Sequence, residues 1–203
     1  YLACSPYKFF GPHMGVLWGR RNRMEEISAY KVRPAPDDLP GKWMTGTLSF
    51  EGVAGTLAAI NYLAALSGQD FDAHASGTSA SRRQALLNAF TKIAAYERPL
   101  LLELLAGLAE ISAIKVWGIT DSERISERVP TVCFTHERFT SQEVARYLGD
   151  RGIFVWDGNY YALALTQSLG LEPEGAVRVG ILHYNTSDEV QRLLASLQEL
   201  DAQ

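Results

Sequence analysis

Apolar residues recur at helical spacing along two long segments of the chain. Residues 50–66 carry them over a broad surface, with small residues on another face, and Ser67-Gly68 follows as a stop signal. Residues 81–111 carry a wide leucine-rich stripe, and Pro99 is expected to kink or restart that helix because proline donates no backbone hydrogen bond. The pattern predicts two helices, with an expected hinge over the small, polar residues 70–79 between them.

From residue 114 the pattern changes to short apolar runs separated by amphipathic segments. Strands are predicted over residues 116–119, 129–134, 152–156 and 176–182. Helices are predicted from the capping box that begins at Thr140 through Leu148, and over residues 162–169 and 187–200. Strands that alternate with helices predict a small α/β or α+β domain in this part of the chain.

The first part of the chain is rich in turn residues. Residues 1–4 and the apolar run bracketed by Gly15 and Gly19 are typical of buried strands. The basic cluster at residues 20–23 is expected to be a solvated turn, because two glutamates follow it almost at once. Residues 24–43 contain three prolines, so little regular structure is expected there.

Composition narrows the functional classes. A chain of 203 residues with 47% hydrophobic content can bury a sizeable core. The formal net charge of −4 gives no electrostatic footprint for nucleic acid or a membrane surface, and no apolar run is long enough to span a bilayer. The two cysteines, Cys4 and Cys133, and the four histidines lack metal-ligand spacing, so no metal site is expected. Isolated cysteines favour a reduced, cytoplasmic setting, and Glu97 and Glu103 are interpreted as solvated-face residues rather than a catalytic pair.

Lys8 is a lone lysine in an apolar, turn-rich segment. It lies among Tyr7, Phe9 and Phe10, and Gly11-Pro12 marks a tight turn after it. Partial desolvation would lower its pKa and make the free amine available as a nucleophile. The alternative is a loop lysine that extends into solvent beside core aromatic residues.

Two further segments offer groups that bind anions. Thr45-Gly46-Thr47 presents hydroxyls and backbone N–H groups suited to a phosphate, although an ordinary turn has the same composition. Arg178 lies inside an apolar strand and needs a partner there. That partner is either a carboxylate of the chain, such as Glu172 or Glu174, or a substrate carboxylate bound by two parallel hydrogen bonds.

These segments, taken in order, resemble the class V aminotransferases, pyridoxal-phosphate enzymes that include the cysteine desulfurases. The chain is most similar to the cysteine desulfurase-like branch. The similarity covers nearly the whole chain and is carried by residues 5–20, 30–35, 45–47, 156–161 and 178–186. It implies an aspartate-aminotransferase-type fold (pyridoxal-phosphate fold type I). The chain would be its C-terminal half, with the end of the large domain over residues 1–70 and a small α/β domain over residues 71–203.

The resemblance also implies roles for individual residues. Lys8 would hold pyridoxal 5'-phosphate as a Schiff base, the internal aldimine, and after release would take the Cα proton of an amino-acid substrate. Ser5 and Tyr7 would contact the cofactor phosphate, although many relatives have histidine in place of Tyr7. Thr47 would reach the phosphate in the partner subunit of a homodimer. Arg178 would bind the substrate carboxylate.

The loop Trp156–Tyr161 carries the clearest departure from the family pattern. Its aromatic residues suit an active-site lid or plain packing, and Asn159 and Tyr161 are expected to contact the substrate. The resemblance places the persulfide-forming cysteine of desulfurases where Tyr161 stands. We therefore expect a pyridoxal-phosphate enzyme acting on an amino acid. The alternatives are a true cysteine desulfurase that uses Cys4 or Cys133, and a truncated, non-catalytic dimerisation module.

Overall fold

The computed structural model describes residues 1–44, 46–68 and 79–203. The chain divides into two compact units, Tyr1–Phe90 and Thr91–Gln203. The domain boundary predicted at residue 70 and most of the expected hinge lie outside the described residues, so both stay predictions.

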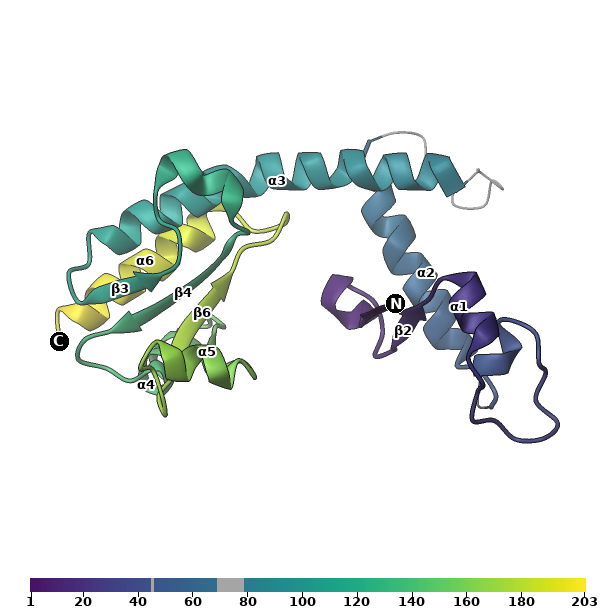
Figure 1. The fold of residues 1–203 in the computed structure, drawn as a ribbon. Coiled ribbons are helices and arrows are strands. Elements are labelled where there is room, and N and C mark those ends of the chain that lie inside the picture. Colours follow the sequence, from purple (N-terminus) through teal and green to yellow (C-terminus); the bar gives the residue numbers. More distant parts are fainter. Residues whose placement is uncertain (45, 69–78) are drawn as a thin grey trace. The chain divides into compact units, whose positions relative to one another are not determined.

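The first unit joins a short antiparallel ribbon to helices (Figure 1). Strands β1 and β2 pair with Leu2 opposite Trp18 and Cys4 opposite Val16. The elements of this unit are β1 (Leu2–Cys4), the 3-10 helix η1 (Pro6–Phe9), β2 (Val16–Trp18), α1 (Arg21–Glu26), the 3-10 helix η2 (Gly41–Trp43), α2 (Phe50–Ala65) and the start of α3 (Ser79–Ala109).

Both strands of the ribbon exist, but the prediction that they are buried is wrong for this chain. Leu2 is 59% exposed, Leu17 60% and Trp18 57%. Apolar strand residues become buried only where a second layer covers them, and a two-stranded ribbon by itself is marginally stable in water. The apolar pattern therefore predicts the two strands correctly, but it does not predict whether a second layer buries them.

The basic cluster forms helix α1 rather than the expected turn. Arg21 pairs with Glu25 at 3.0 Å, four residues on, and Arg23 pairs with Glu26 at 3.0 Å, three residues on. Such exposed pairs stabilise a helix by about 0.2–0.5 kcal/mol each. The helix is solvated, as expected of the cluster, because it contains no buried residue.

The loop from residue 27 to residue 40 has no helix or strand, as the prolines predicted. Its far end is tied back to α1 by two hydrogen bonds. Lys42 Nζ donates to the Glu25 carbonyl at 2.6 Å, and Trp43 Nε1 donates to the Met24 carbonyl at 3.1 Å. The loop is therefore closed at its base by side chains.

Helix α2 confirms its prediction and supports the turn that carries Lys8. Ser49 caps the helix by accepting from the Gly52 N–H at 3.2 Å, and Gly68, with φ of +70°, lies just beyond its end. A Cβ on Gly52 would overlap the Met14 sulfur, and one on Gly55 would lie 3.2 Å from the Pro12 ring. These two glycines therefore let residues 12–14 approach the helix closely.

The second unit begins in the latter part of α3. Of the kink or restart expected at Pro99, the restart is wrong, because α3 continues through that residue. Leu100, Leu101 and Leu104 follow the proline and are buried, so core packing offsets the hydrogen bond that proline lacks. Glu97 is only 8% exposed, so its assignment to a solvated face is also wrong.

A four-stranded antiparallel sheet forms the centre of this unit, in the order β3-β4-β6-β5. Its elements are β3 (Ile114–Trp117), the 3-10 helix η3 (Ser122–Glu127), β4 (Thr131–His136), α4 (Ser141–Gly149), β5 (Trp156–Gly158), α5 (Leu163–Ser168), β6 (Ala176–Gly180) and α6 (Ser187–Asp201). An antiparallel sheet with helices is the α+β alternative of the pattern predicted from residue 114, and the Thr140 capping box opens α4 as predicted.

One predicted strand is misplaced. Residues 152–155 are not a strand, and pairing begins only at Trp156. Gly152 has φ of +70°, and the Ile153 N–H donates to the Leu148 carbonyl at 3.0 Å, so this segment ends helix α4. Ile153 and Val155 pack against the core without joining the sheet at that point, whereas Phe154 is 89% exposed.

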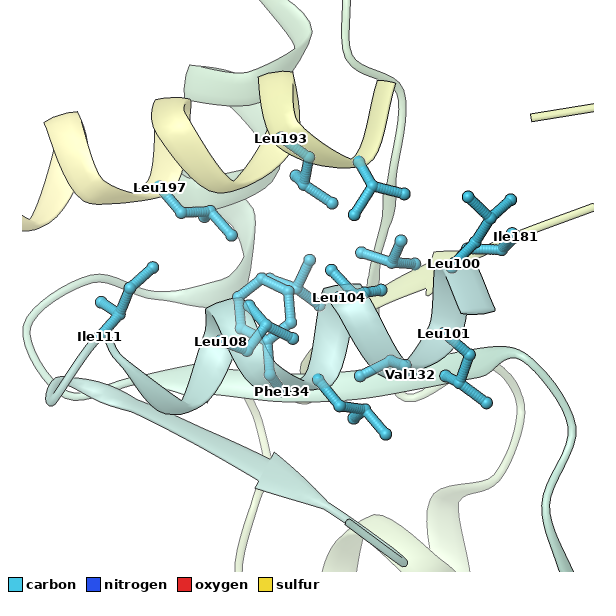
Figure 2. Packing of buried hydrophobic residues seen from close by; sticks show 14 of the residues in the cluster. Leu100, Leu101, Leu104, Leu108, Ile111, Val132, Phe134, Ile181, Leu193 and Leu197 are labelled. Carbon is cyan, nitrogen blue, oxygen red and sulfur yellow. The ribbon is translucent and has the colours of Figure 1, made fainter. Parts of the chain in front are cut away.

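Helices α3 and α6 cover one face of the sheet (Figure 1). Figure 2 shows leucines of α3 lying between α6 and strand β4. Val132, Phe134 and Val177 point into this core and are fully buried. Because side chains alternate along a strand, the residues between them point to the opposite face. Cys133 and Arg178 belong to that second face and are only half-buried.

Candidate functional site

Lys8 lies in the short 3-10 helix η1, within a segment that we call the lysine turn, residues 5–11. Pro6 is buried and begins the helix, and Phe10, with φ of +68°, follows it. The Gly11 N–H donates to the Pro6 carbonyl at 2.9 Å. A Cβ on Gly11 would lie 2.8 Å from the Pro6 Cβ, so only glycine permits this close approach.

The lysine turn brings together three of the predicted site residues. Lys8 Nζ donates to the Tyr7 hydroxyl at 2.9 Å and lies 4.3 Å from the centre of the Tyr7 ring. The hydrogen bond from Lys8, followed by one from Ser5 and by the Lys8 charge, lowers the pKa of Tyr7. The Tyr7 ring also stacks on His13 with 4.9 Å between ring centres. An amine and two hydroxyls therefore share one turn.

The expected desolvation of Lys8 is wrong for this chain. Its side chain is exposed, although Phe9 beside it is half-buried. Thr47 is also exposed, and within the described residues no hydrogen bond joins it to the lysine turn. Thr45, which the sequence groups with Thr47, lies outside the described residues.

Arg178 lies in a row of side chains across the second face of the sheet. In the strand register Trp117 is opposite Cys133, Cys133 is opposite Arg178, and Arg178 is opposite Trp156. Directly opposed residues of antiparallel strands point to the same face. We call these four residues the arginine row.

The Arg178 guanidinium contacts aromatic rings rather than acids. It lies 4.7 Å from the centre of the Tyr160 ring and 5.7 Å from that of Trp156. Among the described residues no hydrogen bond or ion pair holds it. The alternative of a salt bridge to Glu172 or Glu174 is therefore wrong. The Glu172 carboxylate instead accepts a hydrogen bond from Thr166.

Tyr160 is the aromatic neighbour that the sequence analysis missed. Its hydroxyl donates to the Ala176 carbonyl, and burial raises its pKa far above the ordinary value. The residues chosen from the sequence flank it: Tyr161 is fully exposed, and the Asn159 side chain accepts from the Tyr161 N–H at 3.1 Å. No sequence signal separates Tyr160 from Tyr161, because the two neighbouring tyrosines share a backbone with positive φ, 54° and 63°, and differ only in their tertiary contacts.

Cys133 is the remaining polar member of the arginine row. Burial raises the pKa of its thiol, while the charges of Arg178 and Arg128 act in the opposite direction. The net direction is upward, so less thiolate is present at neutral pH than for an ordinary cysteine. The described residues contain no cluster of three or more metal-binding side chains. None of the helices that the structure describes is both long and apolar enough to cross a membrane.

Comparison with solved structures identifies the class of fold. The cysteine desulfurase of Thermococcus onnurineus NA1, solved without ligand, matches with a TM-score of 0.76 and 22% identity over 98% of this chain and 46% of its own. The cysteine desulfurase CsdA of Escherichia coli matches with a TM-score of 0.71 and 22% identity over 97% of this chain and 45% of its own. The fold is therefore part of the pyridoxal-phosphate type I fold, as the sequence predicted.

The family follows from the sequence comparisons. The family model described as aminotransferase class-V matches residues 85–193, which is more than half of the chain, and the chain belongs to this family. A probable cysteine desulfurase of Pseudomonas putida is 31% identical over 98% of this chain and 45% of its own length. The aminotransferase-like protein FGM3 of Gibberella zeae is 30% identical with the same coverage. The chain thus spans about half the length of the curated relatives that it matches.

Proposed function

We propose that the chain is part of a pyridoxal-phosphate-dependent enzyme that acts on an amino acid, with Lys8 as the point of cofactor attachment. The observation that carries this proposal is the lysine turn, in which an exposed primary amine adjoins the hydroxyls of Ser5 and Tyr7. An accessible amine is needed to bond an aldehyde, and hydroxyl donors suit a phosphate. The donor set therefore fits pyridoxal phosphate.

Each residue of the lysine turn has a separate task in this proposal. When bound, pyridoxal phosphate would supply an electron sink that makes the Cα proton of the substrate acidic. The Lys8 amine, when free, accepts that proton as a general base. Ser5 and Tyr7 donate hydrogen bonds to phosphate, with the Tyr7 hydroxyl acting where many relatives have histidine. Thr47 contacts the phosphate held by the partner subunit of a homodimer, and its exposure supports that role.

Arg178 binds the substrate carboxylate in the same proposal. Its guanidinium has no acidic partner among the described residues, so its planar donors are available for two parallel hydrogen bonds. Asn159 and Tyr161 contact the substrate from the adjoining loop. The full exposure of Tyr161 leaves its ring free to do so.

A true cysteine desulfurase is the second candidate, because several relatives are named cysteine desulfurases. That reaction needs a thiolate, and the position implied for the reactive cysteine holds Tyr161. Cys133 lies in strand β4, and its raised pKa makes it a poor source of thiolate. Sulfide release from L-cysteine that is lost in Cys4→Ala or Cys133→Ala would favour this candidate. If the cofactor does not bind, the remaining interpretation is that the chain is a non-catalytic dimerisation module.

The test is covalent labelling of the chain by pyridoxal phosphate over a range of concentrations, followed by borohydride reduction and peptide mapping. Lys8 should be labelled saturably, at lower concentrations than other exposed lysines. Lys8→Ala should abolish this site. Lys115→Ala, which removes an exposed lysine lying over Trp117 at 3.8 Å, should leave it unchanged. Equal labelling of Lys8 and Lys115 at every concentration would contradict the proposal.

A further inference from the structure

The Arg178 guanidinium is held near two aromatic rings and by no acid within the described part of the chain. We infer that Tyr160, with Trp156 beside it, is a positioning residue that holds this guanidinium ready for a carboxylate. This inference rests on the proposed role of Arg178 in binding the substrate carboxylate. The two aromatic neighbours would order the arginine side chain and leave its N–H donors unoccupied.

The mode of contact leaves the useful donors free. An aromatic ring attracts a cation through its face, whereas a carboxylate binds the N–H donors that lie in the plane of the guanidinium. An acidic neighbour would occupy those same donors and would have to be displaced by the substrate. Aromatic neighbours restrict the side chain without that competition.

The supporting residues are themselves fixed to the strand that carries Arg178. The Tyr160 hydroxyl donates to the carbonyl of Ala176, two residues before Arg178 on β6. Trp156 is directly opposite Arg178 on the paired strand β5. Both rings are thus placed by the backbone that places the arginine. Ordering a long side chain before the ligand arrives lowers the entropy that binding must overcome.

The chemistry of the phenol agrees with this role. Desolvation is the main reason that the pKa of Tyr160 lies far above its ordinary value. The ring therefore stays neutral across the physiological range and neither pairs with Arg178 as an anion nor repels an incoming carboxylate. Cys133, on the other side of Arg178, also stays protonated because burial raises its pKa.

The experiment is an NMR titration that follows the Nε–Hε signal of Arg178 in the full chain. The probe is acetate, added at constant ionic strength with chloride replaced. Before any acetate is added, the ring current of Tyr160 should displace the Arg178 signal, and Tyr160→Leu should remove that displacement. In Tyr160→Leu the dissociation constant for acetate should be roughly two- to fivefold higher than in the unmodified chain, the range expected for losing one exposed cation–ring contact.

Two variants separate positioning from a general loss of structure. Tyr160→Phe keeps the ring and should retain both the displacement and acetate binding within about twofold. Tyr147→Leu is the matched control, because it removes a ring that lies 3.5 Å from a different arginine, Arg151. It should leave the Arg178 signal unchanged. A displacement that survives in Tyr160→Leu, or that is also lost in Tyr147→Leu, would overturn the inference.

The same data distinguish this inference from the proposed function. If acetate does not shift the Arg178 signal in the unmodified chain but Tyr160→Leu still removes the displacement, the carboxylate role of Arg178 fails and the positioning role of Tyr160 stands. If acetate shifts the signal equally in the unmodified chain and in Tyr160→Leu, Arg178 binds carboxylate and Tyr160 does not position it.

Discussion

Gly175 should be the most sensitive glycine in the second unit, and Gly175→Ala tests why. Its φ is +66°, and a Cβ built on it would overlap the carbonyl carbon and oxygen of Gly158 and lie 2.5 Å from the Gly158 Cα. Gly158 belongs to β5, the strand that carries Trp156. The clash is with backbone, so a side-chain rotation cannot relieve it.

The expected cost has two parts. An alanine in the left-handed conformation costs roughly 1–2 kcal/mol, and forcing extra volume into a packed site costs roughly 1–3 kcal/mol. Gly175→Ala should therefore destabilise the unit by roughly 2–5 kcal/mol. Gly170→Ala is the matched control, because Gly170 has φ of +69° and a Cβ on it would meet nothing within 4 Å. Gly170→Ala should cost only the conformational part of the stability, roughly 1–2 kcal/mol.

The assay is urea unfolding followed by circular dichroism and tryptophan fluorescence. With a slope of about 2 kcal/mol per molar urea, Gly175→Ala should lower the midpoint by about 1–2.5 M and Gly170→Ala by about 0.5–1 M. The Arg178 signal should also change in Gly175→Ala, because β5 must move away from β6. Equal midpoint shifts in the two variants would refute the reasoning, since the backbone contact would then carry no cost.

Two buried ionisable groups give predictions for pH. Burial lowers the pKa of His136 below its ordinary value of 6.5, against the opposing charge of Asp201. Stability from this group is therefore present above pH 6.5 and is lost as the pH falls toward the lower folded-state value. An NMR titration of the imidazole should give a midpoint below 6.5, and one at or above it would contradict this. Burial raises the pKa of Glu97 above 4.5, despite a hydrogen bond from the His183 backbone, so its stabilising contribution is lost as the pH rises through the folded-state value. Glu97→Gln should raise the urea midpoint at pH 7 but not at pH 4, and a gain that is equal at both values would refute the ionic explanation.

Features that depend on neighbouring residues in the sequence were the ones that could be predicted from it. The Thr140 capping box is satisfied within four residues, and it opens α4 as expected. Helix α2 likewise begins and ends close to its predicted limits. The helix predicted over residues 187–200 is α6, and its apolar residues Val190, Leu193 and Leu197 are buried in the core.

Features that depend on packing between distant segments were predicted less well. The apolar residues of β1 and β2 indicated strands but could not say what covers them. Residues 152–155 are as apolar as a strand, yet they complete the end of α4. Glu97 was assigned to solvent because of its charge, and tertiary packing buries it. The cover of β1 and β2 and the burial of Glu97 are decided by residues remote in sequence, whereas the end of α4 is decided by the hydrogen bond from Ile153 to Leu148, five residues apart.

The lysine turn and the neighbours of Arg178 also differ in how far their proximity can be predicted from the sequence. Ser5, Tyr7 and Lys8 lie within one turn, so their proximity follows from sequence spacing. The neighbours of Arg178 come from separate strands and from the loop after β5, so they depend on register.

A shift of one residue in the pairing of β5 with β6 would place Asp157, rather than Trp156, opposite Arg178. Opposed residues share a face, so the Asp157 carboxylate would then lie beside the guanidinium and pair with it. The same arginine in the same strand would become a structural ion pair, with its donors occupied. Gly175 bridges Gly158 next to this pairing, where there is no room for a Cβ, so we expect the two glycines to hold the observed register. The proposed binding of a carboxylate by Arg178 thus depends on strand register, which explains why inspection of the arginine and its sequence neighbours alone left its partner undecided.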